Sequence, residues 1–206
     1  MTQTLGKEYE FVGHLQRLNT RLNRGALAAL RRGLGKRLGE EGDSLRIFYR
    51  YLPQGVERQA EDSYYLIASI FALYPDTPSY PENTPAYQRN LGASFAGLEK
   101  NQGQGNSDPN ATSSTERRFV ALLNSNSEDL HTHLRHAISP LKAKDIPVDW
   151  AVLLRDLLWW DSDSRRVQRQ WARAFWGRIP STEASQDSDA ESAADGDLVD
   201  PTEADE

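Results

Sequence analysis

The chain has 206 residues, of which 38% are hydrophobic, and a formal net charge of −6 at pH 7; this is enough chain for one domain with a core or for two small ones. Its lack of cysteine excludes disulfides, thiolate metal sites and cysteine nucleophiles. It has no apolar run near the roughly 20 residues that span a bilayer, and no apolar stretch of a signal peptide at its N-terminus. We therefore expect a soluble cytoplasmic protein with no membrane contact.

The negative charge is concentrated at the C-terminus. Residues 181–206 include ten acids and no base, whereas the preceding 180 residues carry 24 bases and 20 acids, a net charge of +4. Because Leu198 and Val199 are the only sizeable apolar residues of this segment, it cannot repay the entropy cost of ordering. We predict a disordered acidic tail over residues 179–206. It either keeps the protein in solution or competes with nucleic acid for the basic body.

The first half of the chain follows the period of helices, with no convincing strand pattern. Apolar residues recur at spacings of three and four, and the run 61–75 is apolar nearly all round, which is typical of a central core helix. A proline-rich loop over 75–90 interrupts the pattern. The helices expected here cover residues 8–23, 27–38, 44–53, 61–75 and 91–98.

The second half begins with residues 99–115, whose composition predicts a flexible linker. We expect helices over 116–125, 128–138, 150–160 and 165–177. Their N-caps are expected at Thr115, Ser127, Asp149 and Ser162 or Asp163, and Gly177 is expected to end the last helix in the C′ position. In the last helix Arg165, Arg166, Arg169 and Arg173 lie away from the apolar stripe. The fold class is all-α, a helical bundle in two subdomains (1–98 and 116–178) joined by the linker and followed by the tail.

Catalytic chemistry is not supported by any motif. Three histidines cluster in 131-HTHLRH-136, but His131 and His133 would lie about 200° apart on a helix, and no acid is placed to complete a metal site. No phosphate-binding loop, dinucleotide-binding glycine motif or nucleophile elbow occurs. We predict no catalytic residue, no metal and no cofactor.

Basic residues are concentrated between positions 14 and 38, where seven bases occur without one acid. A solvated helix face usually mixes signs, because like charges four residues apart repel, so this bias favours a polyanion partner. Arginine suits phosphates, and such contacts bind backbone rather than sequence. Two other interpretations of the basic run stay open: a solvated helix face, and a module that docks an acidic protein surface. The bases of this run are Arg17, Arg21, Arg24, Arg31, Arg32, Lys36 and Arg37, and further basic spots are Arg117, Arg118, Arg135, Lys142 and Lys144.

Six blocks in a fixed order resemble the CasB family, the small subunit of the type I-E CRISPR surveillance complex Cascade. The resemblance covers nearly all of residues 8–178 and implies an all-helical, non-catalytic subunit. It implies two copies arranged head to tail, beside the subunits that hold the CRISPR RNA and the large subunit that reads the PAM. The blocks are 27-LAALRRGL-34, 64-YYLIASIFALYP-75, 90-NLGASFAGL-98, 116-ERRFVALLNSNSEDLHTHLRHAI-138, 147-PVDWAVLLRDLLWW-160 and 165-RRVQRQWARAFWG-177.

The resemblance also implies a basic patch that supports the target DNA strand and guides the displaced non-target strand, which stabilises the R-loop. Because pairing with the CRISPR RNA reads the sequence, the protein needs to reach only backbone. The acidic tail has no counterpart in the family pattern. The resemblance places the patch on Arg31, Arg32, Arg117, Arg118 and Arg135, and charge and position add Arg24, Lys36, Lys142 and Lys144.

Overall fold

The computed structural model describes residues 6–101 and 112–177, and all regular structure within these ranges is helical. This confirms the all-α prediction for the described part of the chain, while the predicted tail 179–206 and most of the linker lie outside it. Nine α-helices occur in the described ranges: α1 (Gly6–Thr20), α2 (Arg24–Arg32), α3 (Gly42–Tyr51), α4 (Glu61–Phe71), α5 (Leu91–Asn101), α6 (Ser114–Leu123), α7 (Leu130–Ala143), α8 (Trp150–Leu158) and α9 (Arg166–Trp176).

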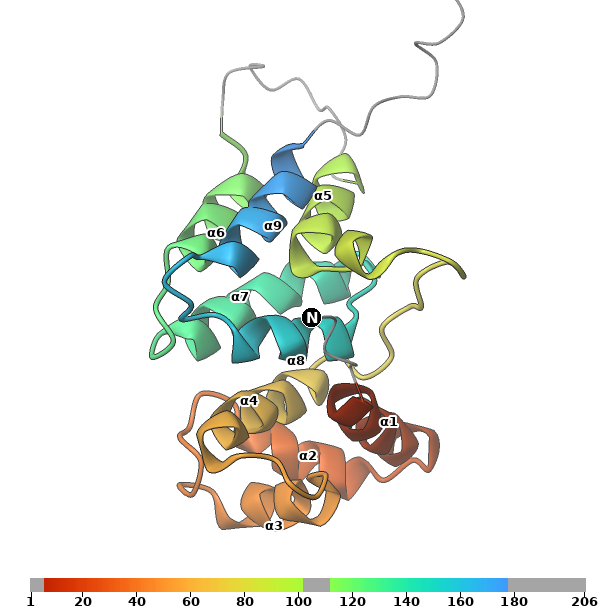
Figure 1. Ribbon diagram of the computed structural model, residues 1–206. Coiled ribbons are helices and arrows are strands. Elements are labelled where there is room, and N and C mark those ends of the chain that lie inside the picture. The colour runs from red at the N-terminus through yellow and green to blue at the C-terminus, as the bar shows by residue number, and fades with distance from the viewer. Residues whose placement is uncertain (1–5, 102–111, 178–206) are drawn as a thin grey trace, which may run out of the picture.

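The helices form two groups that share one apolar core (Figure 1). Helices α1 to α4 lie together, and α1 and α4 pack against α8 of the second group. Helix α4 is the central helix that its apolar sequence predicts: every residue from Ile67 to Phe71 is buried. The ring of Phe71 meets that of Trp150 edge to face at 5.7 Å. The core therefore continues across the boundary between the groups.

Helix α5 belongs to the second group in space, where it packs against α9 and α6. Gly92 permits this contact, because a Cβ there would lie 2.2 Å from the carbonyl oxygen of Trp171. The sequence places residues 91–98 of this helix in the first subdomain and residues 99–101 in the linker, so α5 continues into the start of the predicted linker. The division into subdomains 1–98 and 116–178 stays a prediction about units of folding.

The helix predicted over 27–38 ends at Arg32, so this part of the prediction is wrong. Gly33 is buried against Tyr65, whose hydroxyl would lie 2.2 Å from a Cβ at position 33. The chain then turns through Gly35 and Gly39, whose φ angles of 83° and 102° suit glycine. The basic run is consequently two short helices and a turn rather than one continuous surface.

Helix ends agree only partly with the predicted caps. Asp149 caps α8 as expected, because its Oδ1 accepts from the amides of Ala151 and Val152 at 3.1 and 3.0 Å. Ser113, rather than Thr115, caps α6. The N-cap of α9 is Arg165 with a φ of 46°, and it makes no side-chain cap hydrogen bond.

Two further predicted helix ends match the structure only in part. Helix α7 starts after Asp129 rather than Ser127, and it continues through Pro140 to Ala143. Helix α9 ends before Gly177 as predicted, but Gly177 is extended, with a φ of −64°, rather than left-handed.

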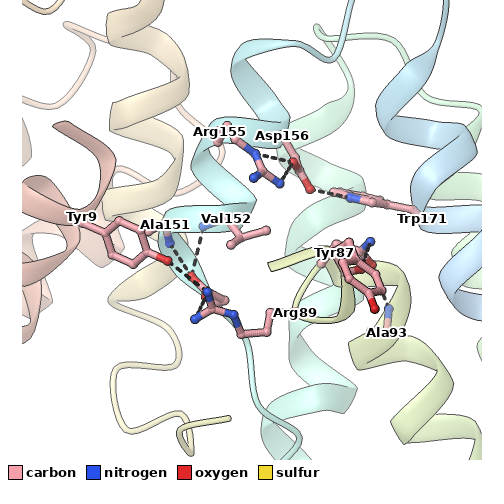
Figure 2. A network of polar contacts seen from close by, with 11 residues as sticks. Tyr9, Tyr87, Arg89, Ala93, Ala151, Val152, Arg155, Asp156 and Trp171 are labelled. Carbon is pink, nitrogen blue, oxygen red and sulfur yellow. Dashed lines mark hydrogen bonds and ion pairs between the residues drawn. The ribbon is translucent and has the colours of Figure 1, made fainter. Parts of the chain in front are cut away.

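Two polar networks fix α8 and α9 (Figure 2). The buried carboxylate of Asp156 accepts from Trp171 Nε1 at 2.7 Å and pairs with Arg155 Nη2 at 2.7 Å. Burial raises the pKa of Asp156, an effect that Arg155 and the Trp171 hydrogen bond oppose. In the second network Arg89 Nη1 pairs with Asp149 Oδ2 at 3.0 Å. The first network therefore joins α9 to α8, and the second fixes the start of α8.

Candidate nucleic-acid interface

Arg31 of α2 and Lys142 of α7 meet at the C-terminal end of α4. Arg31 donates from Nε and Nη2 to the carbonyl of Ala72 at 3.0 and 2.8 Å. Lys142 Nζ donates to the neighbouring carbonyl of Leu73 at 2.8 Å. Carbonyls at a helix C-terminus lack intrahelical partners and carry partial negative charge. Two predicted site residues far apart in sequence are therefore brought together by the same helix end.

The faces of α2 and α7 extend basic charge away from this point. Arg24 lies seven positions before Arg31, and Arg135 seven positions before Lys142, so each pair shares one face of its helix. Arg24, Arg135 and Lys144 are exposed. Within residues 6–101 and 112–177 none of these three forms an ion pair. We call Arg24, Arg31, Arg135, Lys142 and Lys144 the α2–α7 surface.

Arg32 and Lys36 are neutralised by acids that follow the basic run. Arg32 Nη2 pairs with Asp43 Oδ2 at 3.1 Å, and Lys36 Nζ pairs with Glu41 Oε2 at 2.6 Å. The hydrogen bond to Glu41 raises the pKa of Lys36. The absence of acids between positions 14 and 38 is thus compensated in the fold, which weakens the sequence argument for a polyanion at these two residues.

A groove with a volume of about 720 Å³ runs along α4 beside these groups. Lys36 and Arg37 line one side, Leu66 lies on α4, and Asp129 and His131 line the start of α7. The groove is mixed in charge. The groove is therefore less uniformly basic than the α2–α7 surface beside it.

Arg117 and Arg118 lie on α6, which packs against α7. Arg117 Nη1 donates to the carbonyl of Thr112 at 3.0 Å, and Arg118 is exposed. On its other side α6 runs antiparallel to α9. Trp176 Nε1 donates to Glu116 Oε1 at 2.9 Å at one end, and Arg165 donates to the carbonyl of Leu123 at the other.

The four arginines at α9 were not among the predicted site residues. They are exposed, and helix α9 contains no acid. Arginine bias without acid is the same signal that singled out residues 14–38, so it could have indicated this second region. The residues are Arg165, Arg166, Arg169 and Arg173.

Metal-binding clusters and membrane-spanning helices are both absent from the described residues. Within residues 6–101 and 112–177, no group of three or more His, Asp or Glu side chains could hold a metal ion. In the same ranges no helix has both the length and the apolar character needed to cross a membrane.

Known proteins are similar to this chain in sequence and in fold. Residues 26–176 match the family model of CRISPR-associated protein Cse2. The chain is 32% identical over 159 residues to the CRISPR-associated protein Cse2 of Thermus thermophilus, a match that spans 77% of this chain and 82% of that protein. The crystal structure of M. ruber CasB is similar with a TM-score of 0.63 and 32% identity, over 84% of this chain and 94% of that one.

A chain of a CRISPR RNA-guided surveillance complex is similar with a TM-score of 0.61 and 27% identity, over 83% of this chain and 91% of that one. The family model covers well over half of the sequence, including the block from Leu27 to Leu34 and the α9 block up to Trp176. The resemblance inferred from the ordered blocks is therefore confirmed, and the chain belongs to the Cse2 family, also called CasB.

Proposed function

We propose that this protein is the non-catalytic small subunit of a CRISPR RNA-guided surveillance complex of the Cascade type. There it binds nucleic-acid backbone without sequence preference, and so stabilises the R-loop and the displaced DNA strand. Family membership and the likeness to a chain of a surveillance complex support the subunit role. The observation that carries the binding role is the α2–α7 surface, where two basic helix faces converge at the end of α4.

Backbone contacts of this kind can decide R-loop formation. Exchanging a DNA duplex for an RNA–DNA heteroduplex is nearly balanced in free energy, so a few protein–phosphate contacts tip it. Each contact releases counterions and makes binding salt-dependent. The nine proposed residues differ in how free they are to make such contacts.

Arg24, Arg135 and Lys144 are the primary phosphate ligands in this proposal, because no ion pair occupies them within the described ranges. Arg32 and Lys36 can exchange an exposed carboxylate for a phosphate at small cost, since exposed ion pairs contribute little. Arg31 and Lys142 already cap α4 and add positive potential. Arg117 and Arg118 extend the contact along α6.

The partners in this proposal are the subunits that hold the CRISPR RNA, the large PAM-reading subunit, the RNA itself, both DNA strands and a second copy placed head to tail. The second candidate is a helical interaction module whose basic surface docks an acidic protein. The ion pairs of Arg32 and Lys36 with carboxylates favour this candidate, because they show these bases accepting carboxylate ligands.

Salt titration of single-stranded DNA binding separates the two candidates. The double variant Arg135→Ala, Lys144→Ala should lose affinity equally for every sequence, and its log–log salt slope should flatten by about 1.4, at about 0.7 per lost contact. The matched control is Arg46→Ala, Arg50→Ala, which removes the same charge from exposed positions of α3. Equal losses in both variants would refute a localised site. Binding by the unmodified protein that does not depend on salt would favour the interaction module.

A further inference from the structure

Helices α6 and α9 run side by side (Figure 1), and both carry exposed arginines. Phe119 of α6 stacks with Phe175 at 4.5 Å and Trp176 at 5.4 Å between ring centroids, which holds the helices together. All the arginines of the pair are exposed. We call this set the α6–α9 face: Arg117, Arg118, Arg165, Arg166, Arg169 and Arg173.

The α6–α9 face is not neutralised by the part of the chain that the structure describes. None of its arginines forms an ion pair there. Glu116 is the only acid of the two helices, and its Oε1 accepts from Trp176. Arg166 is exposed and lies over the ring of Trp159, 6.0 Å from its centroid.

The ridge on α9 has the shape to bind an extended polyanion. Arg166, Arg169 and Arg173 follow the i, i+3, i+7 pattern and so share one side of the helix over about 10 Å. Like charges at these spacings repel and destabilise the helix. An acidic chain along the ridge removes this repulsion.

The acidic segment 181–206 starts directly after this helix. Four residues separate the end of α9 at Trp176 from Ser181, and the segment then carries ten acids and no base. An extended chain covers about 3.3 Å per residue, so a few residues are enough to return along α9. A short tether also gives a local concentration on the order of millimolar, which populates even a weak contact.

We propose that the acidic C-terminal segment 181–206 docks on the α6–α9 face of its own chain. Bound there, it neutralises the arginines of α9 and shields them from other polyanions. The inference goes beyond the proposed function, because the α9 arginines are not part of the α2–α7 surface. Arg117 and Arg118 belong to this face and also to the nine residues of the proposed function, so the test uses the α9 arginines alone.

The first readout contains no nucleic acid. In the full-length chain, the ten acids of 181–206 are replaced by Asn and Gln, and the indole N–H signals are compared by NMR at low salt. Trp159 and Trp176, which are 45% and 47% exposed, flank the ridge and should shift, whereas the buried Trp150 should not. A synthetic peptide of residues 181–206 added to the neutral-tail protein should reverse the shifts, and salt should abolish the effect.

A cycle of variants controls for overall charge. The triple variant Arg166→Gln, Arg169→Gln, Arg173→Gln in the neutral-tail protein should no longer bind the peptide. The matched triple Arg46→Gln, Arg50→Gln, Arg58→Gln, which has the same net charge, should bind it like the parent. Neutralising the tail should raise single-stranded DNA affinity about tenfold at low salt with intact α9 arginines, and clearly less in the α9 triple.

Three results would overturn the proposal. The first is a set of indole signals that do not respond to tail neutralisation. The second is peptide binding that is equally weakened in both triples. The third is loss of DNA affinity in the α9 triple with unchanged peptide binding, which would assign the face to nucleic acid instead of the tail.

Discussion

Two regions of this protein are rich in arginine and poor in acid along the sequence, yet the fold treats them differently. In the segment after residue 24, Arg31 caps α4 and Arg32 pairs with Asp43. On the α6–α9 face, Arg117 and Arg165 donate to backbone carbonyls, but no arginine forms an ion pair within the described residues. Local charge bias therefore does not indicate which bases are available to a partner. Availability depends on the acids and carbonyls that the fold places beside them.

The comparison also separates bases that stabilise the fold from bases that stabilise only a complex. A guanidinium with two hydrogen bonds to a helix-end carbonyl belongs to the first kind. An exposed arginine without an ion pair, such as Arg169, belongs to the second kind. Substitutions in both regions, and in the buried network that holds α9, test this distinction.

The largest expected effect is on the framework of the α6–α9 face. Asp156→Ala leaves the indole N–H of Trp171 without a hydrogen-bond acceptor in the core and removes the carboxylate that pairs with Arg155. We expect it to lower the free energy of unfolding by about 3 kcal/mol. Urea denaturation measures this. Asp156→Asn is the control, because its amide oxygen can still accept from Trp171, and it should cost less. A loss below about 1 kcal/mol for the alanine variant would mean that this network does not hold α9.

The second effect contrasts the two arginine regions directly. Arg31→Ala should destabilise the protein by about 2 kcal/mol, because it removes two charge-assisted hydrogen bonds from the end of α4. Arg169→Ala removes the same charge from α9 and should stay within about 0.5 kcal/mol of the unmodified protein. Equal costs in thermal or urea denaturation would remove the distinction between the regions.

The features of the fold and of the candidate site that can be predicted from the sequence are those set by interactions between residues close together in the chain. The all-α class, the central helix α4 and the Asp149 cap follow from local periodicity and local hydrogen bonds. The end of α2 at Arg32 depends on Gly33 meeting Tyr65, and the placement of α5 depends on Gly92 meeting Trp171; both contacts are tertiary. For the same reason the partners of Arg31 and Arg32 could not be predicted.

A smaller effect follows from the raised pKa of Asp156. Between the ordinary value of 3.8 and the higher folded value, the folded state keeps a proton that the unfolded state has lost. Stability from this group is therefore present at low pH and declines as pH rises through that window. The stability of the unmodified protein relative to Asp156→Asn, measured as the difference in unfolding free energy, should therefore decrease as pH rises through this window. A difference that rises or stays flat would contradict the burial effect.

The smallest expected effect concerns the neutralised bases. Glu41→Gln frees Lys36 from its ion pair and should raise single-stranded DNA affinity about twofold at low salt, with the gain lost at high salt. The control Glu57→Gln removes an exposed acid that forms no ion pair within residues 6–101 and 112–177. The same gain in both variants would show a general charge effect rather than release of Lys36.

The proposed role in the surveillance complex is tested most directly by the lifetime of the R-loop. The complex is assembled with the unmodified subunit, without it, with Arg24→Ala, Arg135→Ala, Lys144→Ala, or with the control Arg46→Ala, Arg50→Ala, Arg58→Ala. Omission should shorten the lifetime most, the α2–α7 variant should approach that value, and the control should match the unmodified complex. A lifetime unchanged by the α2–α7 variant, in a complex shown to contain it, would contradict the account.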